Sequence, residues 1–113
     1  MHLVPCVFAL ASADLFVTAV DWKPKKTAEL ARLADVRRTG TASALVDHYD
    51  DDDWNALWWV RASGPARVET PRTAGHTAAV AALVARYPQY GARPPEGPAI
   101  LIDVTRWRSW SAT

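Results

Sequence analysis

The sequence predicts a mainly β domain with two helices, in which the strands form a small antiparallel barrel. The chain has 113 residues, a length that fits one compact core, so we expect a single domain over residues 1–113. Half of the residues are apolar and 22% are charged, a composition typical of folded rather than disordered proteins. Five strand-like runs and two helix-like segments follow in the order ββαββαβ, which favours strands joined by hairpins.

The charge balance and the cysteine count exclude several classes of protein. A formal net charge of +1 gives no general electrostatic reason to bind nucleic acid or an anionic membrane. One cysteine, Cys6, excludes an intramolecular disulfide and a multi-cysteine metal site. Because Cys6 lies in an apolar run, we expect it to be buried and inert.

The first two strands are predicted from apolar runs at residues 2–13 and 14–21, with a hairpin connection at 11–14. The small residues at 11–13 have the form of a signal-peptide cleavage site. However, no positive charge precedes the first run, Pro5 interrupts it, and it is too short to span a bilayer. We therefore favour a buried strand over a secretory signal and expect a cytoplasmic protein with no membrane partner.

The first helix is predicted to follow Thr27, a good N-cap residue, and to end near Gly40. Its apolar positions are Leu30, Leu33 and Ala34, which share one face of a helix.

The middle of the chain predicts two more strands separated by an acidic loop. The third strand covers residues 42–49, and the loop at 50–53 is closed by Trp54. The fourth runs from about Leu57 to residue 69 with a bend at residues 64–65, a Gly-Pro pair.

The last third of the chain predicts a helix and a final strand. Thr70 and Pro71 resemble an N-cap followed by a proline at the first helical position, and the Ala-rich segment 77–86 fits a helix packed on the sheet. A proline-rich loop follows at 87–98. Residues 99–107 then form a strong β run that extends towards Trp110.

A cluster of lysines is the strongest candidate for chemistry. The chain has ten arginines and three lysines, and the lysines gather in one window just before the helix predicted at Thr27: Lys23, Lys25 and Lys26. Ammonium groups, a threonine hydroxyl and the free amides of a helix N-terminus together suit a phosphate. The alternative is a solvated loop whose lysines keep the surface soluble.

Other polar groups are weaker candidates. The acidic loop lacks the alternating ligands and the glycine of a cation loop, so we interpret it as a solvated turn. His48 and Tyr49 are neighbours in a strand and would point to opposite faces, and the three histidines are too scattered to predict a metal site. Asp47 and Asp103 lie in apolar strands, where we expect them to be buried and paired.

Six tryptophans are more than the interior of so small a barrel can hold. Some of them must therefore line a ligand cleft or a subunit interface. The adjacent Trp58 and Trp59 are predicted to face opposite sides of their strand.

Several of these segments, in this order, resemble the pyridoxamine 5′-phosphate oxidase-like split β-barrel proteins, and more narrowly their actinobacterial branch that uses the deazaflavin coenzyme F420. The segments that carry the resemblance are HLVP at 2–5, AVDWKPKKT at 19–27, LVDHYD at 45–50, Trp54, LWWVR at 57–61, YPQY at 87–90 and DVTRW at 103–107. The resemblance covers essentially the whole chain and implies a split β-barrel of the FMN-binding type, with Greek-key-like antiparallel strands.

The resemblance also implies a homodimer with the cofactor in a cleft at the subunit interface. The residues at the matching positions are Lys23, Lys25, Lys26 and Thr27 for the phosphate, Leu3, Val4 and Pro5 along the ring, and Trp54 near the cofactor. The implied chemistry is hydride transfer from the reduced ring to a small organic acceptor, and the resemblance names no catalytic acid or base.

The resemblance leaves alternatives open. Members of the family normally begin with a helix and a further strand before the segment matched by residues 2–5, so we expect one barrel strand to be missing here and its edge to need a partner chain. FMN is the alternative cofactor, and a non-catalytic binder of either cofactor is the alternative function. A barrel for single-stranded nucleic acid would need a basic groove, which clustered lysines do not predict.

Overall fold

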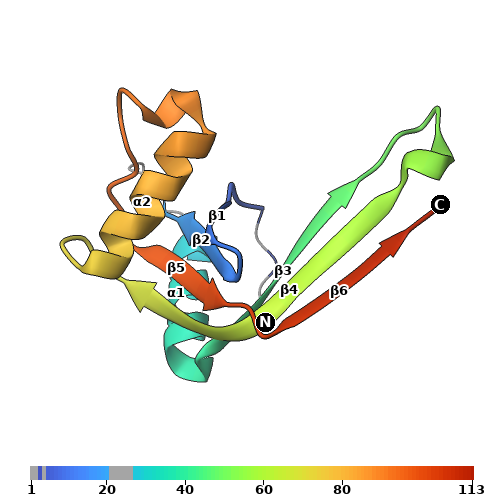
Figure 1. Cartoon of the computed structure of the whole chain (residues 1–113). Helices are drawn as coiled ribbons and strands as arrows, with labels where there is room; N and C mark the ends of the chain where they lie inside the picture. Colours follow the sequence, from blue (N-terminus) through green and yellow to red (C-terminus); the bar gives the residue numbers. More distant parts are fainter. Residues whose placement is uncertain (1–2, 4, 21–26) are drawn as a thin grey trace.

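The computed structural model describes residues 3, 5–20 and 27–113 (Figure 1). Within these described residues, six antiparallel strands and two α-helices follow in the order β1(Ala9–Ser12), β2(Leu15–Ala19), α1(Thr27–Thr39), β3(Thr41–His48), β4(Trp58–Glu69), α2(Ala74–Arg86), β5(Ala99–Asp103), β6(Arg106–Ser111). The described residues also form short 3₁₀ helices at Trp54–Ala56 (η1) and Pro88–Tyr90 (η2). The mainly β prediction with two helices is confirmed.

The long strand β4 belongs to two parts of the molecule. Its second half pairs with β5, which pairs with β2 and then β1; these strands and both helices form what we call the body. Its first half lies between β3 and β6, and these three strands form what we call the arm, which extends away from the body in Figure 1. No described helix is long and apolar enough to cross a membrane.

The bend between arm and body lies at Gly64, as the Gly-Pro pair predicted. A Cβ atom at this position would overlap the backbone oxygen of Asp103 and lie 3.0 Å from the backbone nitrogen of Thr105. Only glycine fits against this backbone, because the neighbour of β4 changes here from β5 to β6.

The body is a sheet covered on both faces. Alternate residues of the central strands point to opposite sides, as Phe16 and Val17 show. One face packs with α1 in a cluster of Phe16, Val20, Leu33, Val36, Ala62, Ala66, Ile100, Ile102 and Val104. The other packs with α2 in a cluster of Ala9, Val17, Ala19, Ala79, Leu83, Ala99 and Leu101. Burial of these side chains is the main stabilising contribution to the fold.

The first strand differs from the prediction. It begins at Ala9 rather than at residue 2, and Cys6, predicted to be buried, is exposed. The ladder with β2 covers only Ala9 to Ser12. Before it, the backbone of Phe8 bonds to the Tyr87 hydroxyl and the Val7 carbonyl accepts from the Thr18 hydroxyl, so side chains take the place of ladder hydrogen bonds.

The second helix begins at Ala74, between the predicted cap at Thr70 and the predicted segment 77–86, and it has a different cap. Thr73, not Thr70, is the N-cap, and its Oγ1 accepts a hydrogen bond of 3.1 Å from the backbone nitrogen of His76. Thr70 instead uses its carbonyl to accept from the Thr73 hydroxyl at 3.0 Å. Arg72 adopts a positive φ of 81° between them, which completes the turn into the helix.

The last strand is divided, and the predicted barrel is not closed. Val104 donates to the Asp14 carbonyl and Thr105 to the Ser63 carbonyl, so the run splits into β5 and β6. Among the described strands, β1 pairs only with β2 and β3 pairs only with β4. The strands therefore form an open antiparallel sheet rather than a closed barrel.

Candidate functional site

The arm has two faces with different surroundings. Side chains of Ala42, Ala44 and Val46 pack against the body cluster, so we call this side the inner face and the opposite side the outer face. Trp58 pairs with His48 and Ser111, whereas Trp59 pairs with Asp47 and Trp110. Trp58 therefore lies on the inner face and Trp59 on the outer face, which confirms the prediction that they point apart.

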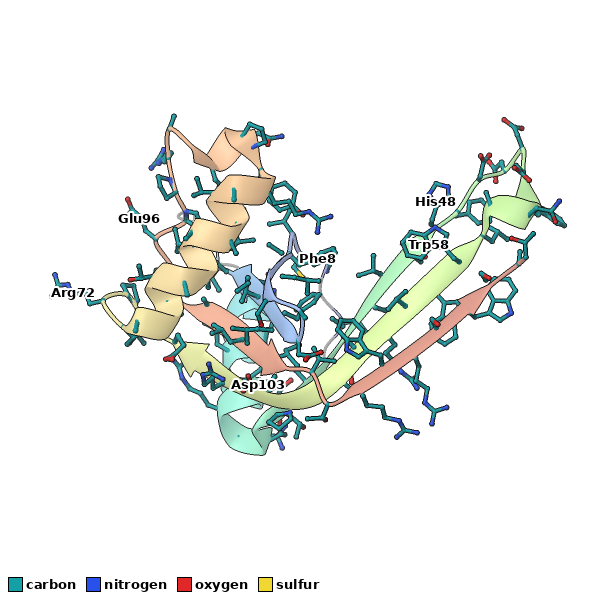
Figure 2. The ribbon with its side chains drawn as sticks, viewed as in Figure 1. Phe8, His48, Trp58, Arg72, Glu96 and Asp103 are labelled. Carbon is teal, nitrogen blue, oxygen red and sulfur yellow. The ribbon has the colours of Figure 1, made fainter. Side chains whose placement is uncertain are left out.

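The inner face presents an aromatic pair to solvent beyond the bend. The rings of Trp58 and His48 stack across the strands with centroids 6.0 Å apart (Figure 2). Nearer the body, Trp107 donates from Nε1 to Asp14 Oδ1 at 3.4 Å, although 45% of this residue is exposed. Large aromatic side chains are exposed to solvent here, as is typical of a surface that binds another molecule.

The outer face contains a hollow of about 410 Å³ near the tip of the arm. Most of its walls are aromatic and aliphatic, and the lining residues are Leu45, Asp47, His48, Tyr49, Leu57, Trp58, Trp59, Arg61 and Trp110. His48 and Trp58 also contribute to it, although their side chains point to the inner face. Leu45 is 65% exposed and Trp110 is 49% exposed. The hollow thus combines apolar walls with a few charged groups, a composition that suits a planar ligand or a partner surface.

A second hollow of about 330 Å³ lies at the start of α2, lined by Pro71, Arg72, His76, Thr77, Val80, Pro95 and Glu96. His76 is buried, and its Nε2 lies 2.8 Å from the Gly97 carbonyl. Since a carbonyl only accepts, Nε2 carries the proton and the ring ties α2 to the loop before β5. This contact gives His76 a structural role.

The predicted cofactor residues fall into two groups. Val4, Lys23, Lys25 and Lys26 lie outside the described residues. Among the others, Leu3 is 92% exposed, Pro5 is exposed, Thr27 is the first residue of α1, and Trp54 is 68% exposed at the start of η1.

Trp54 and α1 lie at opposite ends of β4. The C-terminal end of α1 meets the bend, where the Gly40 carbonyl accepts a hydrogen bond of 2.8 Å from Ala66. Trp54 precedes Trp58, the first residue of β4, and the eight steps from Trp58 to Ala66 span about 26 Å. Trp54 therefore lies far along β4 from the C-terminal end of α1.

The structure corrects the prediction for the two strand aspartates. Asp47 is exposed on the outer face, and Asp103 is exposed and paired with Arg67, whose Nη1 lies 2.6 Å from Oδ2. Asp47 faces solvent from the arm and Asp103 is the last residue of β5, so both carboxylates remain hydrated.

The acidic loop is a solvated turn, as predicted. Asp50 Oδ1 accepts from the Asp52 backbone nitrogen at 2.9 Å, and Asp53 Oδ1 accepts from Asn55 at 3.1 Å. Among the residues that the structure describes, no group of three or more His, Cys, Asp or Glu could hold a metal ion.

The acidic loop also affects the neighbouring tyrosine. A hydrogen bond with Asp51 raises the pKa of Tyr49 above its ordinary value of 10.0.

Three arginines of the outer face were not predicted as site residues. Arg61 of β4 pairs in register with Arg108 of β6, and Arg106 lies on the same side of β6, two residues before Arg108. The signal was present as the alternation of Arg106, Arg108 and Trp110 at every second position, which places all three on one face of a strand.

The fold is similar to that of a known structure. The crystal structure of conserved hypothetical protein Rv2991 from Mycobacterium tuberculosis matches with a TM-score of 0.68 and 18% sequence identity, over 98% of this chain and 69% of that one. No protein-family model matches the sequence, and no curated protein matches it. At this identity the likeness shows the fold alone.

Proposed function

We propose that the chain is a split-barrel protein of the pyridoxamine 5′-phosphate oxidase-like family that binds the deazaflavin coenzyme F420 and serves hydride transfer to a small organic acceptor. The observation that carries the proposal is the position of the lysines. All three lysines of the chain occur in the four residues 23–26, directly before α1 begins at Thr27.

This position suits a phosphate group for two physical reasons. The first turn of a helix has backbone N–H groups without intrahelical partners, and the helix dipole adds partial positive charge there. Lysine ammonium groups supply charge-assisted hydrogen bonds to phosphate oxygens. The helix start at Thr27 fits the predicted phosphate corner, because α1 is 13 residues long and begins where the lysines end.

The exposed aromatic residues of the arm support the homodimer that the resemblance implies, since Trp54, Trp58, Trp107 and Trp110 are each at least 38% exposed. In this homodimer we expect the cofactor to contact both chains.

The cofactor supplies the redox chemistry when it is bound, and the protein supplies binding, orientation and exclusion of water. FMN is the second candidate cofactor, because its phosphate would meet the same corner. A non-catalytic carrier of either cofactor would bind but would transfer no hydride to quinones or enones, which a turnover assay with the reduced cofactor distinguishes.

The proposal is tested by titrating the purified chain with coenzyme F420 and with FMN while tryptophan fluorescence is recorded. We expect saturable quenching by the wild-type chain. Replacing Lys25 and Lys26 with alanine should raise the dissociation constant at least tenfold, because each lost charge-assisted contact costs about 1.5–3 kcal/mol.

The matched control removes two cations from the other end of the same helix. Arg37 and Arg38 lie in the last turn of α1 and are both exposed. The Arg37→Ala, Arg38→Ala variant has the same change in net charge, and we expect it to bind as the wild type does. Equal affinity of the lysine variant and this control would show that the lysines are surface charges only.

A further inference from the structure

The outer face of the arm separates positive from negative charge along its length. Arg61, Arg106 and Arg108 lie on this face nearer the bend. None of them forms an ion pair within the part of the chain that the structure describes. Arg61 and Arg108 are direct cross-strand neighbours, an arrangement of like charges that is unfavourable unless an anion lies nearby.

The tip of the arm carries the opposite charge. Asp47 lies on the outer face, and the loop that follows β3 contains Asp50, Asp51, Asp52 and Asp53. No described arginine or histidine pairs with these five carboxylates. The side chains of Asp47 and Asp52 are exposed and accept no hydrogen bond from a described residue.

Apolar side chains lie between the two charged regions. Trp59 and Trp110 are cross-strand neighbours in the row that contains Asp47, and Leu45 lies opposite Arg61 in the next row. Asp47 therefore lies within the tryptophan row, the acidic loop follows beyond it, and the arginines lie nearer the bend. Half of Trp110 and most of Leu45 are open to water, so this band gains free energy if a second surface covers it.

We propose that the outer face docks on the outer face of a second copy, with the two arms antiparallel and related by a two-fold axis that crosses the strands between Trp59 and Arg61. In this arrangement the row of Asp47, Trp59 and Trp110 in each copy lies over the row of Leu45, Arg61 and Arg108 in the other. Asp47 comes beside Arg61 of the other copy and the acidic loop extends towards Arg106 of the other copy, so one surface is complementary to itself, as a two-fold interface requires. This inference deepens the homodimer of the proposed function by assigning its surface and its orientation.

A second copy fits this face better than a nucleic acid. A polyanion lying along the face would meet the arginines but would also meet five carboxylates at the tip, and the net charge of the chain is only +1. A second copy satisfies both charged regions at once. The antiparallel arrangement also brings the tip of one arm, which carries Trp54, alongside the bend of the other copy.

Charge reversal tests the proposal. One variant carries Arg106→Asp and Arg108→Asp, and the other carries Asp47→Arg and Asp52→Arg. We expect each variant alone to be monomeric in sedimentation velocity, with a dimer dissociation constant raised about 100-fold or more by like-charge contacts. Mixed one to one, the two variants should form a heterodimer, because each tip then faces an opposite charge. A single chain with all four substitutions should dimerise again.

The control reverses two arginines on the body, Arg37→Asp and Arg72→Asp, both of which are exposed. This variant should dimerise as the wild type does. Circular dichroism of every variant checks folding, and recovery of the dimer on mixing excludes misfolding as the cause of dissociation.

Several results would overturn the proposal. A monomeric wild-type chain at micromolar concentration, unchanged dimers of the reversed variants, or failure of the mixture to recover a dimer would each do so. So would salt-sensitive binding of a labelled single-stranded oligonucleotide that the arginine reversal abolishes. Cofactor titration separates this inference from the proposed function: saturable binding with a failed charge exchange rejects the interface alone, and charge exchange without binding rejects the function alone.

Discussion

Substitution of Gly64 by alanine should destabilise the protein more than the same substitution at Gly40. The added Cβ would overlap the Asp103 backbone oxygen and crowd the Thr105 nitrogen, so the backbone itself must move. Overpacking of this kind costs up to about 3 kcal/mol. The unfolding entropy of a chain of 113 residues is about 0.24 kcal/mol/K, so this cost lowers the melting temperature by about 12 °C.

The measurement is a thermal melt followed by circular dichroism at one fixed protein concentration, since association changes the apparent stability. Gly40→Ala provides the comparison. Gly40 has a φ of +70° but no atom within 4 Å of an added Cβ, so only backbone strain opposes the substitution, about 1 kcal/mol or about 4 °C. A Gly64→Ala variant that melts within about 2 °C of the wild type would refute the close packing at the bend.

Two further predictions concern single hydrogen bonds. The Tyr87 hydroxyl donates to the Phe8 carbonyl at 2.9 Å and accepts from the Phe8 nitrogen at 3.4 Å, so Tyr87→Phe should cost about 1 kcal/mol in a urea unfolding experiment; an unchanged midpoint would contradict this link. Because a hydrogen bond with Asp51 raises the pKa of Tyr49, Asp51→Asn should lower it towards 10.0, measured by NMR titration of labelled tyrosine. The stability from this bond is present below pH 10 and is lost as the pH rises through the raised pKa; equal titration curves for the two proteins would exclude the bond.

Local patterns predicted the elements whose signals lie within one segment. The helix that ends at Gly40, the third strand and the bend at Gly64 all depend on neighbouring residues, and each was predicted to within a few positions. The start of β1 was predicted wrongly because the Val7 and Phe8 backbones bond to the side chains of Thr18 and Tyr87 instead of forming a ladder, and such contacts are not visible in a local pattern. Exposure of Cys6 follows from the same limit.

The pairing of Arg61 with Arg108 on the outer face of the arm could not be predicted, because it depends on the register between β4 and β6. Arg61 and Arg108 are far apart in sequence, and only the pairing of β4 with β6 makes them neighbours. The division of the last run into β5 and β6 likewise depends on hydrogen bonds of Val104 and Thr105 with distant carbonyls. By contrast, the opposite orientations of Trp58 and Trp59 follow from the strand period alone and were predicted correctly.

The cofactor stoichiometry of the dimer and of a monomeric variant tests the central claim, that two chains together form the binding site. The measurement is a titration with coenzyme F420 of the wild type, of the Arg106→Asp, Arg108→Asp variant, and of its one-to-one mixture with the Asp47→Arg, Asp52→Arg variant. We predict one cofactor per chain for the wild type, no saturable binding for the variant alone, and binding regained in the mixture. A monomeric variant that binds as tightly as the wild type would contradict a site formed from two chains.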